Sequence, residues 1–285
     1  MYTTLSRLKI DEIGMQQRFV GKNILVTGAS TGIGESIAVR LAEEGGNIAI
    51  NYSRNDVEAG KTAERVRAAH QAGGYSNAKH SIHKADVSQE HAVNDMFGEV
   101  LANWGRLDIL INNAGIQKPA PSHESLTEDF DRILGVNLKG CYLCSRTAIN
   151  HFLSREGGGV IVNNSSVHAI IPKPKYLSYS ISKGGMENLT KSLALEYADR
   201  GIRVNAVGPG AIVTPINMAW INDPVAKGEV ESHIPMGRAG EAEEIAAVFA
   251  FLASKEASYI TGQTLFACGG LTLYPEFRVA WSSGE

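Results

Sequence analysis

Tyr179 and Lys183 are the two residues of this sequence whose types and spacing most directly suggest chemistry. They stand four positions apart within a pattern typical of a helix, so they lie on one helix face. A free phenol has a pKa near 10 and is a poor base at neutral pH, but a nearby ammonium group favours the phenolate. We expect Tyr179 to exchange a proton with an alcohol or carbonyl group while Lys183 lowers its pKa. Taken alone, Tyr179 also fits an ordinary core tyrosine.

A glycine-rich segment, Thr27-Gly-Ala-Ser-Thr-Gly-Ile-Gly34, stands between an apolar run and a helical pattern. Glycines let the backbone turn tightly and approach a pyrophosphate, whose charge the helix N-terminus holds. Glycines also mark plain turns, but here strand, loop and helix follow in the order that a phosphate site needs. The segment predicts contacts with a dinucleotide cofactor from Gly28, Ser30, Thr31, Gly32, Ile33 and Gly34.

Short apolar runs alternate with helical patterns along the chain, and these elements must position the residues above. The predicted strands are 23–27, 47–51, 79–85, 107–111, 159–163, 202–206 and 264–267. The predicted helices are 33–44, 56–72, 90–104, 129–152, 179–197 and 241–253. Near-continuous apolar strands that alternate with helices indicate a parallel sheet covered on both faces. We therefore expect an α/β fold with a single Rossmann-type, doubly wound parallel sheet of about seven strands.

No Pro/Ser-rich linker and no repeat of fixed period divides the chain. We predict one domain over residues 21–285, preceded by an extension over residues 1–20. The segment at about 211–240 is punctuated by prolines and weakly periodic. It is expected to form a flap that closes over a substrate and excludes water.

The composition excludes several classes of protein. The 285 residues are 44% hydrophobic and 20% charged, and 27 Lys+Arg against 30 Asp+Glu give a formal net charge of −3. This mix argues against disorder and leaves no basic surplus for binding nucleic acid. No apolar run reaches the ~18 residues of a membrane helix, and the first residues do not match a signal peptide.

The three cysteines do not form a disulfide framework and suit a reducing cytosol, which predicts a cytoplasmic protein. Cys141 and Cys144 form a Cys-x-x-Cys inside a helical pattern, away from a strand end. We interpret both as packing residues. Because no other Cys or His stands at ligand spacing, no metal site is expected.

Three motifs follow one another in the chain, namely the glycine-rich segment, Asn112-Asn-Ala-Gly115 and Tyr179-x-x-x-Lys183. In this order they resemble the motifs of the short-chain dehydrogenase/reductase family. The resemblance runs from about Phe19 to the C-terminus. Four further segments resemble the bacterial glucose 1-dehydrogenase branch of that family, namely residues 165–168, 182–186, 234–237 and 271–275.

The resemblance implies an NAD(P)-dependent oxidoreductase that exchanges a hydride with a secondary alcohol or carbonyl. It gives Lys183 a hydrogen bond to the nicotinamide ribose, and Asn137 the support of a water-linked proton path to that lysine. Ser166, thirteen residues before Tyr179, matches the substrate-positioning serine, with Ser165 as the competing candidate. The resemblance adds cofactor contacts from Asp86, Val87, Asn113, Ala114, Gly115, Pro209, Gly210, Ile212 and Thr214.

Two of the cofactor contacts have an alternative reading. Asp86, on the ligand side of the sheet, either accepts from the adenine amino group or caps the helix that begins near Ser88. The second strand ends in Asn51-Tyr-Ser-Arg54, with no carboxylate to hold a ribose 2′-hydroxyl. An uncharged Asn51 and a nearby Arg54 tolerate a 2′-phosphate, which predicts NADP, with NAD also used. Arg54 also fits a solvated loop residue.

The predicted substrate residues depart from the glucose 1-dehydrogenase pattern. Gln117 and Ala169 stand where that branch usually has acidic residues, and Lys173 where it usually has tryptophan. We expect substrate contacts from Ser166, Gln117, His168 and Tyr179, with His168 either binding a hydroxyl or capping a turn. A sugar or polyol is the first expectation, and a generic ketone, aldehyde or 3-oxoacyl reductase is the alternative. A non-catalytic dinucleotide sensor is the alternative from another class.

The resemblance also implies assembly, because family members pair through two long helices, here about 129–152 and 179–197, and form tetramers. We therefore expect a homotetramer. The tail over 265–285 is rich in apolar side chains and is expected to pack at a subunit interface near an active site. Those side chains are Phe266, Leu271, Tyr274, Phe277 and Trp281.

Overall fold

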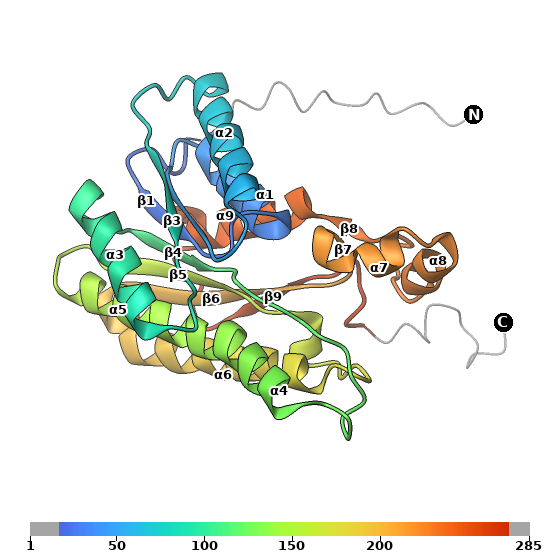
Figure 1. The fold of residues 1–285 in the computed structure, drawn as a ribbon. Helices are drawn as coiled ribbons and strands as arrows, with labels where there is room; N and C mark the ends of the chain where they lie inside the picture. Colours follow the sequence, from blue (N-terminus) through green and yellow to red (C-terminus); the bar gives the residue numbers. More distant parts are fainter. Residues whose placement is uncertain (1–16, 274–285) are drawn as a thin grey trace.

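A seven-stranded parallel sheet runs through residues 17–273, the part of the chain that the computed structural model describes (Figure 1). Its strand order is β3-β2-β1-β4-β5-β6-β9, and every neighbouring pair is parallel. The strands are β1 (Asn23–Val26), β2 (Asn47–Tyr52), β3 (His80–Lys84), β4 (Ile109–Asn112), β5 (Gly159–Asn164), β6 (Ile202–Pro209) and β9 (Thr264–Ala267). This arrangement confirms the predicted Rossmann-type fold.

Helices cover both faces of the sheet (Figure 1). One face carries α1 (Gly32–Glu43), α2 (Asp56–Ala72) and α9 (Ala242–Ala253). The other carries α3 (Glu90–Trp104), α4 (Thr127–Leu134), α5 (Gly140–Leu153) and α6 (Leu177–Tyr197). Two buried apolar clusters, one on each side of the sheet, hold these layers together.

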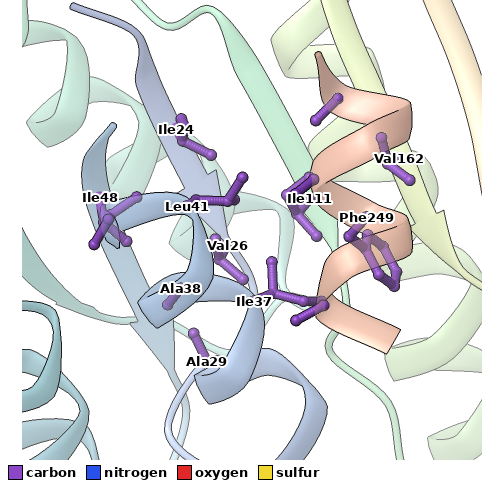
Figure 2. Packing of buried hydrophobic residues seen from close by; sticks show 14 of the residues in the cluster. Ile24, Val26, Ala29, Ile37, Ala38, Leu41, Ile48, Ile111, Val162 and Phe249 are labelled. Atoms are coloured by element: carbon purple, nitrogen blue, oxygen red, sulfur yellow. The ribbon is translucent and has the colours of Figure 1, made fainter. Parts of the chain in front are cut away.

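The alternation of side chains along β1 shows how the clusters are built. Ile24 and Val26 face α1, where Leu41 packs on them (Figure 2), while Leu25 between them belongs to the opposite cluster. All three side chains are 0% exposed. A strand that is buried on both faces cannot shift its register without exposing apolar side chains. The register of β1 therefore fixes the position at which the glycine-rich loop begins.

The predicted helix 129–152 is in fact α4 and α5 joined by a π-helical turn over Gly135–Lys139. Asn137 lies in this turn and is 0% exposed. Its amide bonds to groups outside the helix, described below, and the wider turn places it inward. Single π-helical turns inside α-helices often occur at functional sites.

The predicted flap 211–240 contains two short strands and two short helices at one end of the sheet (Figure 1). The strands β7 (Ile212–Val213) and β8 (Gly240–Glu241) pair in parallel. Between them lie a 3-10 turn over Pro215–Asn217, then α7 (Met218–Ile221) and α8 (Pro224–Ser232). Asp223 caps α8 by accepting from the backbone of Val225, and Pro224 opens the helix without losing a hydrogen bond.

Within residues 17–20, the end of the predicted extension, Arg18 and Phe19 pack on the domain. Phe19 is 1% exposed in the core, and Arg18 forms ion pairs with Glu44 and Glu256 at 2.5 and 2.7 Å. The rest of the extension lies outside the described residues, as do Tyr274, Phe277 and Trp281 of the predicted tail. Within residues 17–273, no helix combines the length and the apolarity that crossing a membrane requires.

Cys141 and Cys144 pack in α5 as predicted, 4% and 1% exposed. Burial raises the pKa of the Cys141 thiol to about 12 and also raises that of Cys144. Both side chains are therefore thiols rather than reactive thiolates at neutral pH.

Candidate active site

A cleft with a volume of 870 Å³ lies against the glycine-rich loop after β1, the loops after β2 to β6 and the flap. The chain order of the sheet reverses between β1 and β4, and ligands of such sheets bind at this point beyond the carboxyl ends of the strands. Every catalytic, cofactor and substrate residue predicted from the sequence lines the cleft, except Asn137. The cleft therefore joins segments that stand far apart in the chain.

Tyr179 lies in the first turn of α6, close enough to the hydroxyl of Ser166, just after β5, for Ser166 to lower the pKa of the phenol. Lys183 follows one turn later. Its Nζ donates to the backbone oxygen of Asn164 at 2.6 Å and lies 5.5 Å from the centre of the Tyr179 ring. The three side chains predicted to act together thus meet on one wall of the cleft.

The electrostatics of this group differ from the sequence-based expectation. Burial raises the pKa of Tyr179, and the bond from Ser166 opposes that rise. Burial also lowers the pKa of Lys183 to about 8. In the protein alone, the expected lowering of the Tyr179 pKa by Lys183 is therefore absent, because the buried ammonium is directed to Asn164 and desolvation outweighs its charge.

Ser165 and Ser166 face different surroundings. The Ser166 hydroxyl accepts from the backbone N–H of His168 at 3.1 Å, and it lowers the pKa of Tyr179. The hydroxyl of Ser165 is buried and has no hydrogen-bond partner among residues 17–273. Of these two serines, Ser166 and not Ser165 acts on the pKa of the Tyr179 phenol, which favours Ser166 as the positioning serine.

Asn137 does not line the cleft, and its side chain forms hydrogen bonds to two elements, the loop after β4 and the helix α6. Its Oδ1 accepts from the backbone N–H of Ile116 at 2.8 Å, and its Nδ2 donates to the Ile116 oxygen and to Ser182 Oγ, both at 3.0 Å. Ser182 in turn donates to the backbone oxygen of Tyr179 at 2.7 Å. This buried amide therefore ties the loop after β4 to the helix turn that carries the phenol.

The glycine-rich loop fits the pyrophosphate of a dinucleotide. The N-cap of α1, Thr31, makes no side-chain hydrogen bond to the helix, so the first backbone N–H groups are available to a ligand. A Cβ atom at Gly34 would lie 2.3 Å from the Gly28 oxygen and from Asn113 Nδ2. Asn113 also bonds to the oxygens of Thr27 and Gly28, so only glycine allows this close packing.

Asp86 shapes a turn and does not cap the following helix. Its Oδ1 accepts from the backbone N–H and the hydroxyl of Ser88 at 3.0 and 2.7 Å. The helix α3 begins later, at Glu90, with Gln89 as its N-cap. The capping alternative is therefore wrong, and Asp86 lines the cleft at the end of β3.

Asn51 and Arg54 differ in how free they are to bind a cofactor. Asn51 is 1% exposed, its Oδ1 accepts from Gly28 N–H at 3.2 Å, and its Nδ2 donates to the oxygens of His83 and Ala85. Its amide is thus engaged in holding the glycine-rich loop against β2 and β3. The exposed Arg54 lines the cleft and forms no ion pair within residues 17–273.

On the substrate side, His168 serves both roles that the sequence left open. Its Nδ1 bonds to the Ile171 oxygen at 3.0 Å, which braces the turn, while its ring also lines the cleft, 6.3 Å from the Tyr179 ring. Burial lowers the pKa of His168, so the ring is neutral at pH 7 and its Nε2 is a hydrogen-bond acceptor. Gln117 Nε2 donates to the Ile216 oxygen at 3.5 Å.

Sequence reasoning missed several residues of the cleft. Asn164, at the end of β5, donates from Nδ2 to Asn113 Oδ1 at 2.8 Å, and its backbone oxygen accepts from Lys183. It therefore links the loop after β4 to β5 and to Lys183. Its place next to Ser165 at a strand end was the available signal. The flap side chains Ile216 and Trp220 also line the cleft, but their segment has no strong periodicity.

A parallel Rossmann-type sheet whose cleft joins an open helix N-terminus to a Ser–Tyr–Lys group defines a dinucleotide-dependent oxidoreductase. A family model described as enoyl-(acyl carrier protein) reductase matches residues 28–272. Glucose 1-dehydrogenase of Gluconobacter oxydans is 50% identical over 268 residues, 94% of this chain and 98% of its own. 3beta-hydroxysteroid dehydrogenase 1 of Eggerthella lenta is 49% identical over 258 residues, 90% of this chain and 96% of its own.

Among solved structures, a 3-ketoacyl-(acyl-carrier-protein) reductase from Brucella melitensis, complexed with NADH, is 36% identical, with a TM-score of 0.81. The match covers 89% of this chain and 99% of that one. The chain belongs to the short-chain dehydrogenase/reductase family. It is an NAD(P)-dependent oxidoreductase acting on CH–OH groups, and it resembles glucose 1-dehydrogenase, as the sequence predicted. The alternative of a non-catalytic sensor is set aside.

Proposed function

We propose that this protein oxidises a CH–OH group of a sugar or polyol, with NADP as cofactor and NAD also accepted. The observation that carries the proposal is that Ser166, Tyr179 and Lys183 line one cleft, which also receives the open N-terminus of α1. The 50% identity to the Gluconobacter oxydans glucose 1-dehydrogenase supports a sugar-like substrate.

In the proposed mechanism, the substrate hydroxyl binds between Ser166 and Tyr179. Ser166 orients the hydroxyl, and Tyr179, in its phenolate form, takes the hydroxyl proton and becomes a phenol as the carbon–oxygen single bond becomes a double bond. Bound NAD(P) supplies the hydride acceptor, and its positively charged ring offsets the burial that raises the phenol pKa. Lys183 holds the nicotinamide ribose, and Asn137 keeps α6 in register with the loop after β4. His168 Nε2 and Gln117 bind further hydroxyls.

The substrate is tested by mixing the purified protein with NADP or NAD and a panel of neutral sugars and polyols, while following the absorbance of the reduced nicotinamide. We expect turnover with at least one of them. Turnover only in the reverse direction, with ketones, aldehydes or a 3-oxoacyl thioester and NADPH, would instead support the reductase alternative.

A second candidate substrate is a bulky ring alcohol such as a 3β-hydroxysteroid. Apolar side chains of the flap and of the segment after β9 line the cleft, namely Ile216, Trp220, Val230 and Leu271. These side chains suit a flat apolar ring better than a sugar. The 49% identity to the Eggerthella lenta enzyme supports the same reading. Including a 3β-hydroxysteroid in the panel distinguishes the two candidates.

The NADP preference rests on Arg54, which lines the cleft at the end of β2 without an ion-pair partner in the described part of the chain. An arginine can grip a 2′-phosphate bidentately. Arg54→Ala is expected to weaken NADP binding roughly tenfold and NAD binding much less, as measured by titration of each cofactor. Equal losses for the two cofactors would remove Arg54 from the 2′ site.

We also propose that the protein is a cytoplasmic homotetramer. Exposed apolar side chains occur along α5 and α6, namely Tyr142, Leu153, Leu177, Ile181 and Leu195. Such a set of side chains marks a surface that another subunit covers. The three cysteines are free thiols, which supports a reducing compartment.

A further inference from the structure

Lys173 brings a positive charge into the same cleft as Ser166, His168 and Tyr179. It stands in the segment Pro172-Lys-Pro-Lys175, between the 3-10 turn after β5 and the start of α6. Its side chain is exposed, so a ligand entering the cleft can reach the ammonium. None of the roles assigned above uses this residue.

The position of the Lys173 ammonium is defined by its surroundings. Pro172 and Pro174 fix the backbone on either side, and the Tyr176 N–H closes the turn by donating to the Lys173 oxygen at 3.2 Å. The Nζ atom lies 4.2 Å from the centre of the Tyr176 ring. That ring meets the Tyr179 ring edge-on, with 6.5 Å between their centres. One tyrosine thus separates the charge from the proposed proton carrier.

No carboxylate neutralises this charge within residues 17–273, because no Asp or Glu oxygen there lies within 4.0 Å of Lys173 Nζ. The carboxylates that line the cleft are Asp86 and Asp129, and both are engaged. Asp86 accepts from Ser88, and Asp129 pairs with Lys118 at 2.5 Å. The ring of His168, which also lies near Tyr179, is neutral at pH 7 because burial and the charge of Lys173 lower its pKa.

We propose that Lys173 binds an anionic group, a carboxylate or a phosphate, on the substrate. The substrate would then be a hydroxylated anion, a sugar acid or a sugar phosphate, whose reacting hydroxyl bonds to Tyr179. The neutral imidazole of His168 suits a hydroxyl group near the reacting carbon. The ammonium of Lys173, which has no carboxylate partner among residues 17–273, suits an anionic group farther from that carbon. The inference rests on the proposed function and narrows it, because the anionic group takes no part in the oxidation.

The first test compares kcat/KM for glucose, gluconate and glucose 6-phosphate with NADP. We expect an anionic substrate to exceed glucose by roughly tenfold or more, since a charged hydrogen bond contributes about that factor. Gluconate and glucose 6-phosphate distinguish the carboxylate from the phosphate. If glucose is the best of the three, the inference is overturned and the proposed function stands. If no sugar or polyol of either kind is oxidised, the proposed function itself fails.

The second test changes the charge. Lys173→Met should lower the ratio of kcat/KM for the anion to that for glucose by roughly tenfold, through KM, and Lys173→Arg should restore it. Lys175→Met is the matched control, because Lys175 is an exposed lysine of the same segment that does not line the cleft. It should leave the ratio unchanged. An equal effect of both methionine variants would assign the selectivity to general surface charge and overturn the inference.

A binding measurement keeps the inference testable without turnover. Calorimetric titration of the NADP complex with gluconate and with inorganic phosphate should give weaker binding to Lys173→Met than to the parent for one of these anions. Equal binding by the two proteins would contradict the role of Lys173.

Discussion

At the scale of single residues, burial changes the pKa values of the two groups that are proposed to act on the substrate. Burial raises the pKa of Tyr179 and lowers that of Lys183 to about 8, so both side chains favour their uncharged forms more than they would in water. The sequence predicted which residues meet, because four positions on a helix share a face. It did not predict these shifts, because the degree of burial depends on elements far away in the chain, such as β5, where Asn164 accepts from Lys183.

The buried ammonium of Lys183 should lower the stability of the free protein. Its pKa is about 8 in the folded chain, below the ordinary value of 10.5, so at pH 7 both states carry the proton and the full cost of burial is present. As the pH rises from 8 to 10.5, the folded state loses the proton first and this cost disappears.

Lys183→Met should therefore raise the free energy of unfolding at pH 7 by about 1–3 kcal/mol, partly offset by the lost hydrogen bond to Asn164. The gain should vanish above pH 10.5. Urea unfolding without cofactor at both pH values measures this. A variant less stable than the parent at pH 7 would show that the ammonium is not desolvated as described.

At the scale of elements, what could be predicted depends on whether the cause is local. Strands buried on both faces carry near-continuous apolar runs, so β1, β4 and β5 were found from the sequence. The π-helical turn at Gly135–Lys139 was not, because it depends on bonds from Asn137 to Ile116 and Ser182, 21 and 45 positions away. The bonds of the Asn51 side chain to the distant backbone groups of Gly28, His83 and Ala85 could not be predicted for the same reason.

The close packing of the glycine-rich loop leads to a prediction with a matched control. Gly34→Ala should weaken cofactor binding at least tenfold and destabilise the fold, because the new Cβ would lie 2.3 Å from the Gly28 oxygen. Gly60→Ala, within α2, meets nothing within 4 Å and should stabilise the protein by about 0.5–1 kcal/mol. Cofactor titration and thermal unfolding measure both. Normal cofactor affinity in Gly34→Ala would contradict the described loop.

At the scale of the whole molecule, the sheet order places the cleft, and the exposed helix faces favour assembly. In a parallel sheet the carboxyl ends of all strands lie at one edge, so the edge that binds ligands could be predicted from the sequence. The helices α7 and α8 of the flap beside the cleft could not be predicted, because their segment has little periodicity. Leu195 on α6 is 87% exposed. An apolar side chain that is so exposed on a helix face fits a surface that another subunit covers.

The proposed tetramer predicts a mass four times that of one chain in light scattering at micromolar concentration. Leu195→Glu should shift the protein toward smaller species, because a carboxylate would be buried in an apolar contact. Val57→Glu, on α2 at 68% exposure, is the control and should leave the mass unchanged. A monomeric parent protein, or equal effects of the two substitutions, would argue against pairing through α6.

The central claim is that Tyr179 carries the proton between the substrate and the protein, and one substitution tests it most directly. Tyr179→Phe removes a single oxygen, so the fold and cofactor binding should survive, as checked by unfolding and by NADP titration. General acid–base catalysis contributes roughly 10²–10⁴-fold, so kcat with a substrate that the parent oxidises should fall by at least that range. Near-normal kcat in a folded variant that binds NADP would contradict the mechanism.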